Sequence, residues 1–275
     1  MRTKDLAKFI NERERVRENK EAKKPWPWTK DPILSKYRFC NVHREDDKVT
    51  RWITHNWREP FEESQELWFA IVFARLFNLP RTLSEVGIND VMLWRPEKLR
   101  KRLRELREDG PIFNGAYIVS TNGKAMDKVD YLIQCVLGPL WAARKGLRPT
   151  KGITLSYYHE KLMQFDGLGS FMAAQVVADL KYVEPLRSAS DWYTWAASGP
   201  GSRRGLNRVF DRPVDARWYE PEWLEQLTKL RAALLKNLPP WGEELHAQDL
   251  QNCLCEFDKY ERVRLGEGRP KQLYP

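Results

Sequence analysis

Two glycine-containing stretches of the sequence have the residue types that hold phosphate groups. In the first, Gly167 and Gly169 are one residue apart, and Ser170 follows directly before an apolar helical stretch. The start of a helix exposes backbone N–H groups and carries partial positive charge from the helix dipole. Such a turn can hold one phosphate of a nucleic-acid backbone, or it can be a tight turn between two packed helices. These residues alone leave both interpretations open.

The second stretch runs over residues 198–207, SGPGSRRGLN. Gly199 and Gly201 let the backbone approach a ligand closely, and Ser202 can cap a following helix. Arg203 and Arg204 offer planar pairs of donors that suit a phosphate. The stretch therefore predicts a phosphate site for a small group, with a capped helix start and solvated arginines as the alternative. The sequence has no Gly-x-x-x-x-Gly-Lys-Ser/Thr motif, so ATP-dependent kinase activity is not expected.

Two polar segments could line a substrate pocket. Within residues 38–57, Asn41 and Arg44 recur at the spacing of one helix face. In the C-terminal segment, Gln251 and Asn252 are flanked by apolar residues, and their amide groups can pair with the planar edge of a base. The alternatives are a solvated helix face for the first segment and a satisfied structural network for the second.

The charge balance favours a polyanionic partner. The 275 residues include 47 Lys and Arg against 38 Asp and Glu, which gives a net charge of +9 at pH 7. Nucleic acid is the first candidate, although a membrane surface would also attract such a chain. No apolar run approaches the length of a bilayer span, and the N-terminus lacks the apolar core of a signal peptide. We therefore expect a soluble, intracellular protein.

The cysteines do not form the pattern of a disulfide framework. Cys40, Cys135, Cys253 and Cys255 are too few for a chain of this size, so a reducing compartment is expected. His246 with Cys253 and Cys255 would supply three zinc ligands at an unusual spacing, whereas a zinc site needs about four. Packed or solvated thiols are the favoured interpretation, and we predict neither a metal nor a cofactor.

Apolar periodicity and helix breakers predict an all-α protein. The expected helices span residues 1–24, 46–58, 62–79, 96–108, 125–143, 156–164, 171–181, 189–197, 221–237 and 246–263. A short strand or hairpin is expected only at residues 115–120, before a Thr-Asn-Gly turn. We expect a charged N-terminal arm over residues 1–30. The helical domain would follow over residues 31–275, with two lobes meeting near residues 146–152.

The predicted helices 156–164 and 171–181, with Gly167 and Gly169 between them, resemble the helix-hairpin-helix element by which many DNA repair proteins hold a backbone phosphate. Glycosylases of that superfamily carry a catalytic aspartate at a similar offset to that of Asp191, which lies 22 residues after Gly169. Bifunctional members carry a nucleophilic lysine where this chain has Phe171. The resemblance therefore excludes lyase chemistry through that position.

Four stretches together resemble a known family, the α-glutamyl/putrescinyl-thymine pyrophosphorylases and the helical domain attached to phage 5-hydroxymethyl-deoxyuridine DNA kinases. They are residues 38–47 (RFCNVHREDD), the 167–169 hairpin with Asp179 and Leu180, residues 199–205 (GPGSRRG), and residues 251–260 (QNCLCEFDKY). The resemblance implies a glycosylase-like helical fold and a role in thymidine hypermodification of phage DNA. The chain would work in the cytoplasm of the infected bacterium.

In such a pathway, an upstream kinase phosphorylates 5-hydroxymethyl-deoxyuridine in double-stranded DNA. A family member then replaces the phosphate with a free amino acid, described as glycine or serine, and the modified DNA resists host restriction. Because the sequence lacks a P-loop, it resembles the transferase and not the kinase. The leaving group, monophosphate or diphosphate, and the amino acid used stay open.

The resemblance also implies roles for the residues above, on a nucleotide flipped out of the duplex. The DNA backbone would be held by Gly167, Gly169 and Ser170. The departing phosphate would be held by Gly199, Gly201, Ser202, Arg203 and Arg204. The base would lie in a pocket of Asn41, Arg44, Gln251 and Asn252. Asp191 or Asp47 would be the catalytic carboxylate, and Cys40 adding to the pyrimidine ring is a less favoured alternative.

Two other functions remain compatible with the residues. A monofunctional DNA glycosylase would use the same fold, hairpin and Asp191 to break the glycosidic bond. A non-catalytic DNA-binding domain would need only the hairpin and the positive charge. Neither requires a second phosphate site, so the arginine-containing stretch favours the transferase.

Overall fold

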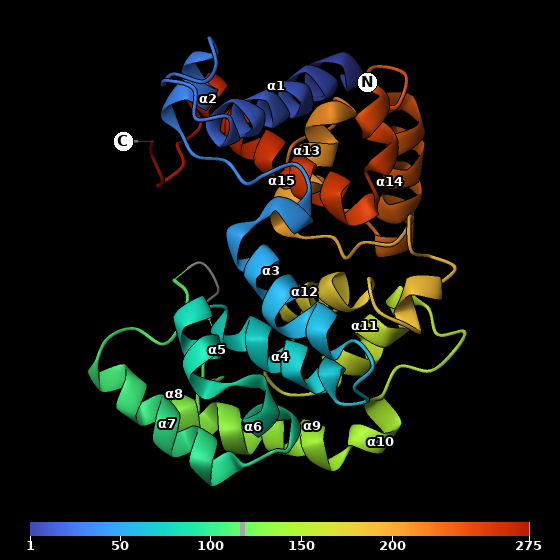
Figure 1. The fold of residues 1–275 in the computed structure, drawn as a ribbon. Coiled ribbons are helices and arrows are strands. Elements are labelled where there is room, and N and C mark those ends of the chain that lie inside the picture. Colours follow the sequence, from blue (N-terminus) through green and yellow to red (C-terminus); the bar gives the residue numbers. More distant parts are fainter. Residues whose placement is uncertain (116–118, 275) are drawn as a thin grey trace. The chain divides into compact units, whose positions relative to one another are not determined.

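The computed structural model describes residues 1–115 and 119–274, and their regular secondary structure is helical (Figure 1). Apart from the helices, an isolated antiparallel bridge joins Tyr37 to Leu273. The all-α prediction is therefore confirmed. The hairpin predicted at 115–120 includes residues 116–118, which lie outside the described residues. No helix in the described part of the chain is both long and apolar enough to cross a membrane.

The chain divides into two units, each with its own internal packing. Unit 1 comprises residues 1–47 and 193–275, so it is built from both ends of the sequence. Unit 2 is the continuous stretch 48–192. The boundary that the sequence suggested near residues 146–152 lies within unit 2.

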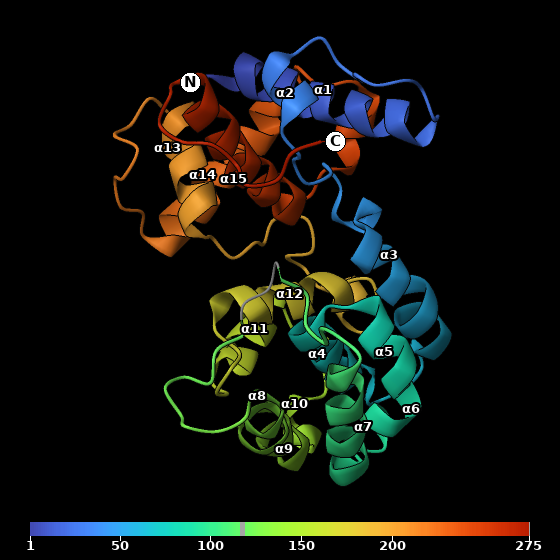
Figure 2. The same cartoon turned by 90° about the vertical axis from the view of Figure 1, so that its left-hand side faces the viewer.

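Unit 1 contains the long helices α1, α13, α14 and α15 and the short helix α2, which Figures 1 and 2 show from two sides. Their bounds are Thr3–Glu21 (α1), Pro32–Lys36 (α2), Pro200–Val209 (α13), Glu220–Leu234 (α14) and Ala247–Arg264 (α15). One-turn 3₁₀ segments lie at Arg44–Asp46 and Pro240–Glu244. Helix α15 contacts α1, α2, α13 and α14, so it is the central element of this unit.

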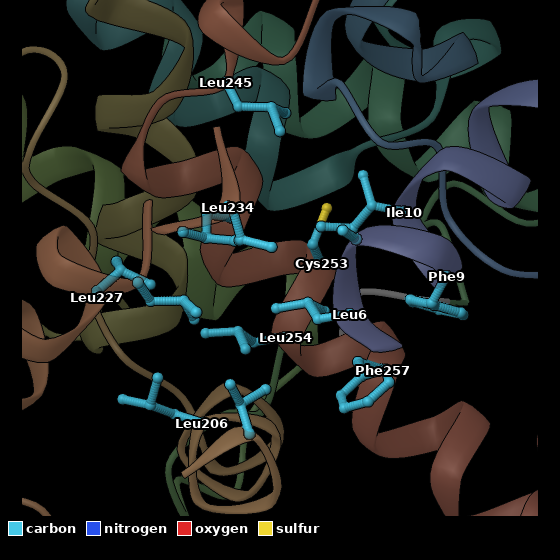
Figure 3. Close-up of a cluster of buried hydrophobic side chains, with 14 of the residues drawn as sticks. Leu6, Phe9, Ile10, Leu206, Leu227, Leu234, Leu245, Cys253, Leu254 and Phe257 are labelled. Atoms are coloured by element: carbon cyan, nitrogen blue, oxygen red, sulfur yellow. The ribbon is translucent and has the colours of Figure 1, made fainter. Parts of the chain in front are cut away.

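The core of unit 1 joins the two ends of the chain (Figure 3). Leu6, Phe9 and Ile10 lie at three- and four-residue spacing on α1 and are at most 4% exposed. The Phe9 ring lies 5.5 Å from that of Phe257 on α15, measured between centroids. The N-terminal helix, highly charged in sequence, is therefore a core element on one face.

Helices α13 and α15 approach closely because glycines lie at their contact. A Cβ on Gly205 would collide with the backbone carbonyl of Leu254, and one on Gly201 would collide with the Cys255 sulfur. Both positions therefore exclude larger residues for packing reasons. This accounts for Gly201 without a ligand.

Unit 2 is a cluster of shorter helices. They are α3 (Lys48–Ile53), α4 (Leu67–Phe77), α5 (Pro80–Val86), α6 (Ile88–Met92), α7 (Pro96–Glu108), α8 (Lys128–Tyr131), α9 (Gly138–Ala142), α10 (Arg144–Leu147), α11 (Leu155–Met163) and α12 (Ser170–Leu180). Two π-helical segments, Thr54–Arg58 and Leu132–Leu137, continue α3 and join α8 to α9, and 3₁₀ turns lie at Glu59–Phe61 and Leu186–Ser188. Every residue of α4 is buried, as expected for a helix that is apolar on all sides.

A buried ion pair fixes α12 against α4. Asp179 of α12 accepts two hydrogen bonds from the guanidinium of Arg75, at 2.5 and 2.6 Å, and both side chains are at most 1% exposed. Arg75 also donates to Asn78 and to Thr50 of α3. A bidentate pair of this kind sets orientation as well as distance. The helix that follows the 167–169 hairpin is thereby held in one position.

The helix predicted at 189–197 is wrong, because residues 189–199 form turns and extended chain. Local polar contacts replace a helical ladder there. Lys181 Nζ donates to the Trp192 carbonyl at 3.0 Å, and the Trp192 indole donates to the Lys181 carbonyl at 2.7 Å. The carboxylate of Asp191 is bonded to the backbone of α11. Ser202 does take part in capping α13, but from within its first turn: Gly199 is the N-cap, and its N–H donates to Ser202 Oγ in a capping box.

Candidate functional site

The segment 38–47 of unit 1 is held by hydrogen bonds to α1 and α15. Arg13 of α1 donates to the carbonyls of Cys40 and Asn41, the latter at 2.8 Å. The Cys40 N–H donates to Glu256 at 3.2 Å, and the Arg44 N–H donates to Asp249 at 3.0 Å. These bonds fix the backbone on both sides of Asn41.

Two of the predicted pocket residues meet at this segment. Asn252 Nδ2 donates to the Asn41 carbonyl at 3.1 Å, while the Asn41 side chain donates to the Asp46 carbonyl at 2.8 Å. Both side-chain amides therefore have protein partners. Gln251, which precedes Asn252 on α15, is partly exposed.

The start of α13 is closed by its own residues. The Gly199 N–H donates to Ser202 Oγ at 2.9 Å, and Ser202 Oγ donates back to the Gly199 carbonyl at 3.1 Å. Ser202 is fully buried. Its hydroxyl is thus occupied in shaping the helix start, which orients the backbone N–H groups of the first turn.

Arg203 is the more exposed of the two arginines, with 43% of its side chain accessible. Its Nε donates to Ser198 Oγ at 2.6 Å, and its Nη2 donates to Glu220 at 2.9 Å. Burial alone would raise the pKa of Glu220, but hydrogen bonds from Ser198 and Arg203 lower it below its ordinary value. An ionised carboxylate therefore holds the Arg203 guanidinium at the N-terminus of α13.

Arg204 points to a different carboxylate. Its Nε lies 3.3 Å from Asp258, and its Nη1 lies 3.1 Å from Asp215. Asp258 also binds Arg208 at 2.8 Å. Arg203 and Arg204, although adjacent in sequence, therefore bind different carboxylates and do not form one joint set of donors.

The predicted phosphate residues and pocket residues meet on one helix. A Cβ on Gly199 would lie 3.9 Å from Gln251 Nε2, and Gly201 packs on Cys255 one turn further along α15. Asn252, next to Gln251, holds Asn41. The start of α13 and the 38–47 segment thus both adjoin the α15 face that carries Gln251, Asn252 and Cys255.

A cluster that the sequence analysis missed lies at the start of α15. The Asp249 carboxylate is 2% exposed and lies 3.0 Å from His246 Nε2 and 3.7 Å from His43 Nδ1. Its other oxygen accepts the Arg44 N–H. Burial alone would raise the pKa of Asp249, but the charge of His246 and the contacts with His43 and Arg44 lower it. The spacing His246-x-x-Asp249 at a helix start was the available signal.

In unit 2, the two glycines of the hairpin between α11 and α12 have different roles. Gly167 has φ +78°, and a Cβ there would lie 2.7 Å from a methyl group of Val136. Gly169 has φ −63° and ψ 170°, and a Cβ there would meet no heavy atom within 4 Å. The fold therefore requires glycine at position 167, whereas position 169 opens to free space.

Asp166 and Ser170, which flank the two glycines, are polar and exposed, whereas Leu168 between them is buried. Ser170, the first residue of α12, is exposed, and the preceding Asp166 accepts hydrogen bonds from the Gly167 N–H and from Lys124. The hydrogen bond from Lys124 holds the pKa of Asp166 below its usual value. The hairpin thus places one exposed helix N-terminus beside a paired carboxylate and ammonium.

Asp191 caps α11. One carboxylate oxygen accepts the Leu155 N–H at 2.8 Å, and the other accepts the Ser156 N–H at 2.9 Å. The predicted base therefore has a structural role in the helix that precedes the hairpin, and its catalytic role stays a prediction. Asp47, the other predicted base, is the last residue of unit 1, and its N–H donates to the Arg44 carbonyl at 3.0 Å.

The cysteines are free thiols. Cys40 is an exposed residue, yet desolvation of its sulfur by the surrounding protein and the charge of Glu256 raise its pKa to about 12. A thiol with this pKa is a poor nucleophile at neutral pH. Within the described ranges, no three His, Cys, Asp or Glu side chains are placed to hold a metal ion.

Comparison with known proteins gives one consistent result. A family model described as the helical domain of 5-hmdU DNA kinase matches residues 2–269. The 5-hmdU DNA kinase of Bacillus phage SP10 is 28% identical over 206 residues, which are 67% of this chain and 32% of that protein. The chain therefore matches about a third of its curated relative's length. No solved structure matches it.

Proposed function

Because its residues 2–269 match that family model, the chain belongs to the 5-hmdU DNA kinase helical-domain family, and we propose that it is an amino acid:DNA transferase. Its substrate would be double-stranded phage DNA in which 5-hydroxymethyl-deoxyuridine has been phosphorylated by an upstream kinase. It would replace that phosphate with a free amino acid, glycine or serine. The modified DNA would then resist host restriction.

The observation that carries this proposal is the meeting of two sets of residues on α15. Arg203 and the start of α13 suit a departing phosphate, and the amide of Gln251, next to the contact between Asn252 and Asn41, suits a base edge. A reaction at the exocyclic methylene needs both features within a few ångströms of each other. The exposed fraction of Arg203 leaves donors for a ligand.

We propose that the hairpin of unit 2 binds the DNA backbone. The open space over Gly169, the exposed Ser170 and the N-terminus of α12 suit one backbone phosphate. The net charge of +9 supports a nucleic-acid partner. A helix-hairpin-helix, glycosylase-like fold is part of the same proposal, as is flipping of the target nucleotide.

The chemistry requires three things of the protein. The departing phosphate must be stabilised, for which Arg203 and Arg204 are proposed, together with the backbone at Gly199 and Gly201. The incoming amine must lose a proton, for which the sequence predicts Asp47 or Asp191. Water must be kept from the methylene carbon after the phosphate leaves.

Nucleoside mass spectrometry tests the proposal. The protein is incubated with duplex DNA carrying 5-phosphomethyl-deoxyuridine and with glycine or serine, and the digested nucleosides are analysed. We expect a new nucleoside whose mass corresponds to replacement of phosphate by the amino acid. DNA carrying unphosphorylated 5-hydroxymethyl-deoxyuridine is the matched control and should stay unchanged.

The same experiment separates the alternatives. A glycosylase would release free base and leave alkali-labile abasic sites without an added amino acid. A DNA-binding domain would leave every nucleoside unchanged. Either outcome contradicts the transferase proposal.

A further inference from the structure

The proposed transferase needs a group that accepts a proton from the incoming ammonium, and the two predicted carboxylates suit this step poorly. Both oxygens of Asp191 already accept backbone N–H groups. A carboxylate is also far less basic than an amine, whereas an imidazole is closer. Only one histidine lies within the 38–47 segment, between Asn41 and Arg44.

The surroundings of His43 are built to orient an imidazole. Its Nδ1 faces the buried Asp249 carboxylate at 3.7 Å, and its ring meets that of Trp241 edge-on, with the centroids 5.7 Å apart. Asp249 is itself fixed by His246 and by the Arg44 N–H. About a fifth of the His43 side chain is exposed, so the ring is held but reachable.

Charged groups from three elements lie around His43. Asp249 and His246 come from the start of α15, Glu14 from α1, and Asp46 from the 3₁₀ turn that follows His43. Arg17 of α1 pairs with Glu14 and Asp46 and offsets part of their charge. Burial lowers the pKa of His43, but the contact with Asp249 and the carboxylates around it outweigh this effect, so the pKa is raised.

We propose that His43 is the general base of the amine-transfer reaction, with Asp249 and His246 as its positioning residues. This inference rests on the proposed transferase function. The Asp249 carboxylate faces Nδ1 at 3.7 Å, which leaves Nε2 to face the substrate amine. The arrangement repeats the logic by which a buried carboxylate orients a catalytic histidine.

In the step, the ammonium group of the amino acid gives one proton to Nε2 of His43. The freed lone pair on nitrogen forms a bond to the exocyclic methylene carbon. The bond between that carbon and the phosphate oxygen breaks, and its electron pair leaves with the phosphate. The imidazolium is stabilised by the Asp249 carboxylate until its proton passes to solvent.

The test compares His43→Gln with His55→Gln in the transfer assay on phosphomethyl-deoxyuridine DNA. His55 lies in unit 2 and is 67% exposed, which makes it a matched control. We expect His43→Gln to lower turnover at neutral pH by about 10²-fold or more, the range of general-base catalysis. The control should keep wild-type turnover.

The pH profile distinguishes a base from a structural residue. The wild-type rate should rise with pH through the pKa of His43, because only the neutral imidazole accepts a proton. His43→Gln should lose this dependence and recover rate as rising pH supplies free amine. His43→Ala with added imidazole provides a second variant, in which we expect partial rescue. Asp249→Asn should move this rise in rate to lower pH, since removal of the negative charge lowers the pKa of His43.

Three outcomes bear on the inference in different ways. A wild-type chain that makes no new nucleoside overturns the proposed function itself. Transfer by the wild type with full activity and an unchanged pH profile in His43→Gln overturns the role of His43 alone. A loss of rate in folded His43→Gln that is equal at every pH, without imidazole rescue in His43→Ala, also overturns it.

Discussion

Arg203 and Arg204 are neighbours in the sequence, yet each is held by a different carboxylate. Arg203 lies at the start of α13 with Ser198 and Glu220, whereas Arg204 is bound by Asp215 and Asp258. From the sequence, both were predicted to belong to one phosphate site. We propose Arg203, whose side chain is the more exposed and lies at the start of α13, as the one that meets a leaving group.

Arg203→Ala should therefore lower turnover in the transfer assay by about 10²-fold, the loss seen when one preorganised donor to a developing charge is removed. Arg15→Ala, which removes an exposed arginine of α1, is the control and should leave turnover unchanged. Affinity for unmodified duplex should change little in both variants. A fall in duplex affinity as large as the fall in turnover would contradict a role for Arg203 at the leaving phosphate.

The His43 cluster shows why single residues were hard to place from the sequence. The Arg44 N–H and the Asp249 carboxylate that it binds are 205 positions apart in the chain. Their meeting depends on packing between the two ends of the sequence, which local patterns do not encode. In contrast, Gln251 and Asn252 could be singled out from the sequence because apolar residues flank them, and their place in a base pocket stays a prediction.

The helices themselves were largely predictable, because their apolar positions repeat with helical period. The helix predicted at 96–108 matches α7 (Pro96–Glu108), where a proline begins the helix and leucines face inward. The helix predicted at 62–79 is shorter in the structure, Leu67–Phe77, since Asn78 adopts a left-handed conformation that ends it. Pro80, which directly follows the predicted range, begins the next helix, α5.

The hairpin between α11 and α12 allows a matched pair of variants. Gly169→Val should keep the melting temperature and weaken duplex binding, because the added side chain occupies open space where a phosphate would approach. Gly167→Val should lower stability by roughly 1–3 kcal/mol, because it strains a left-handed residue and meets Val136. Thermal melts and fluorescence anisotropy measure the two effects. Unchanged affinity in folded Gly169→Val would return the hairpin to a purely structural role.

The variant Asp191→Asn distinguishes a structural role of Asp191 as a helix cap from a catalytic role as a general base. An amide can accept hydrogen bonds through only one oxygen, so one backbone N–H at the start of α11 loses its partner. We expect unfolding free energy to fall by about 1 kcal/mol, as for other lost caps. If Asp191 is only a cap, transfer per folded molecule should stay at the wild-type level across pH. A selective loss of transfer at low pH would instead support the catalytic role that the sequence predicted.

For the whole molecule, binding to DNA should be mainly electrostatic. The net charge of +9 and a hairpin that would contact phosphate predict little sequence preference. We expect the dissociation constant for duplex DNA to rise at least about tenfold between roughly 50 and 200 mM salt. Two duplexes of unrelated sequence should give the same slope. A flat response to salt would contradict this mode of binding.

Because unit 1 is discontinuous, its helix α1 is synthesised long before most of the helices on which it packs. Leu6, Phe9 and Ile10 find their partners on α13, α14 and α15, which leave the ribosome only after residues 48–192 have been made. At typical translation rates this interval lasts roughly ten to thirty seconds. During it the apolar face of α1 has only N-terminal partners such as Phe39, while unit 2 already has all of its own residues. Nascent chains should therefore depend on holding chaperones at their N-terminal helix, and this dependence should end when α15 emerges.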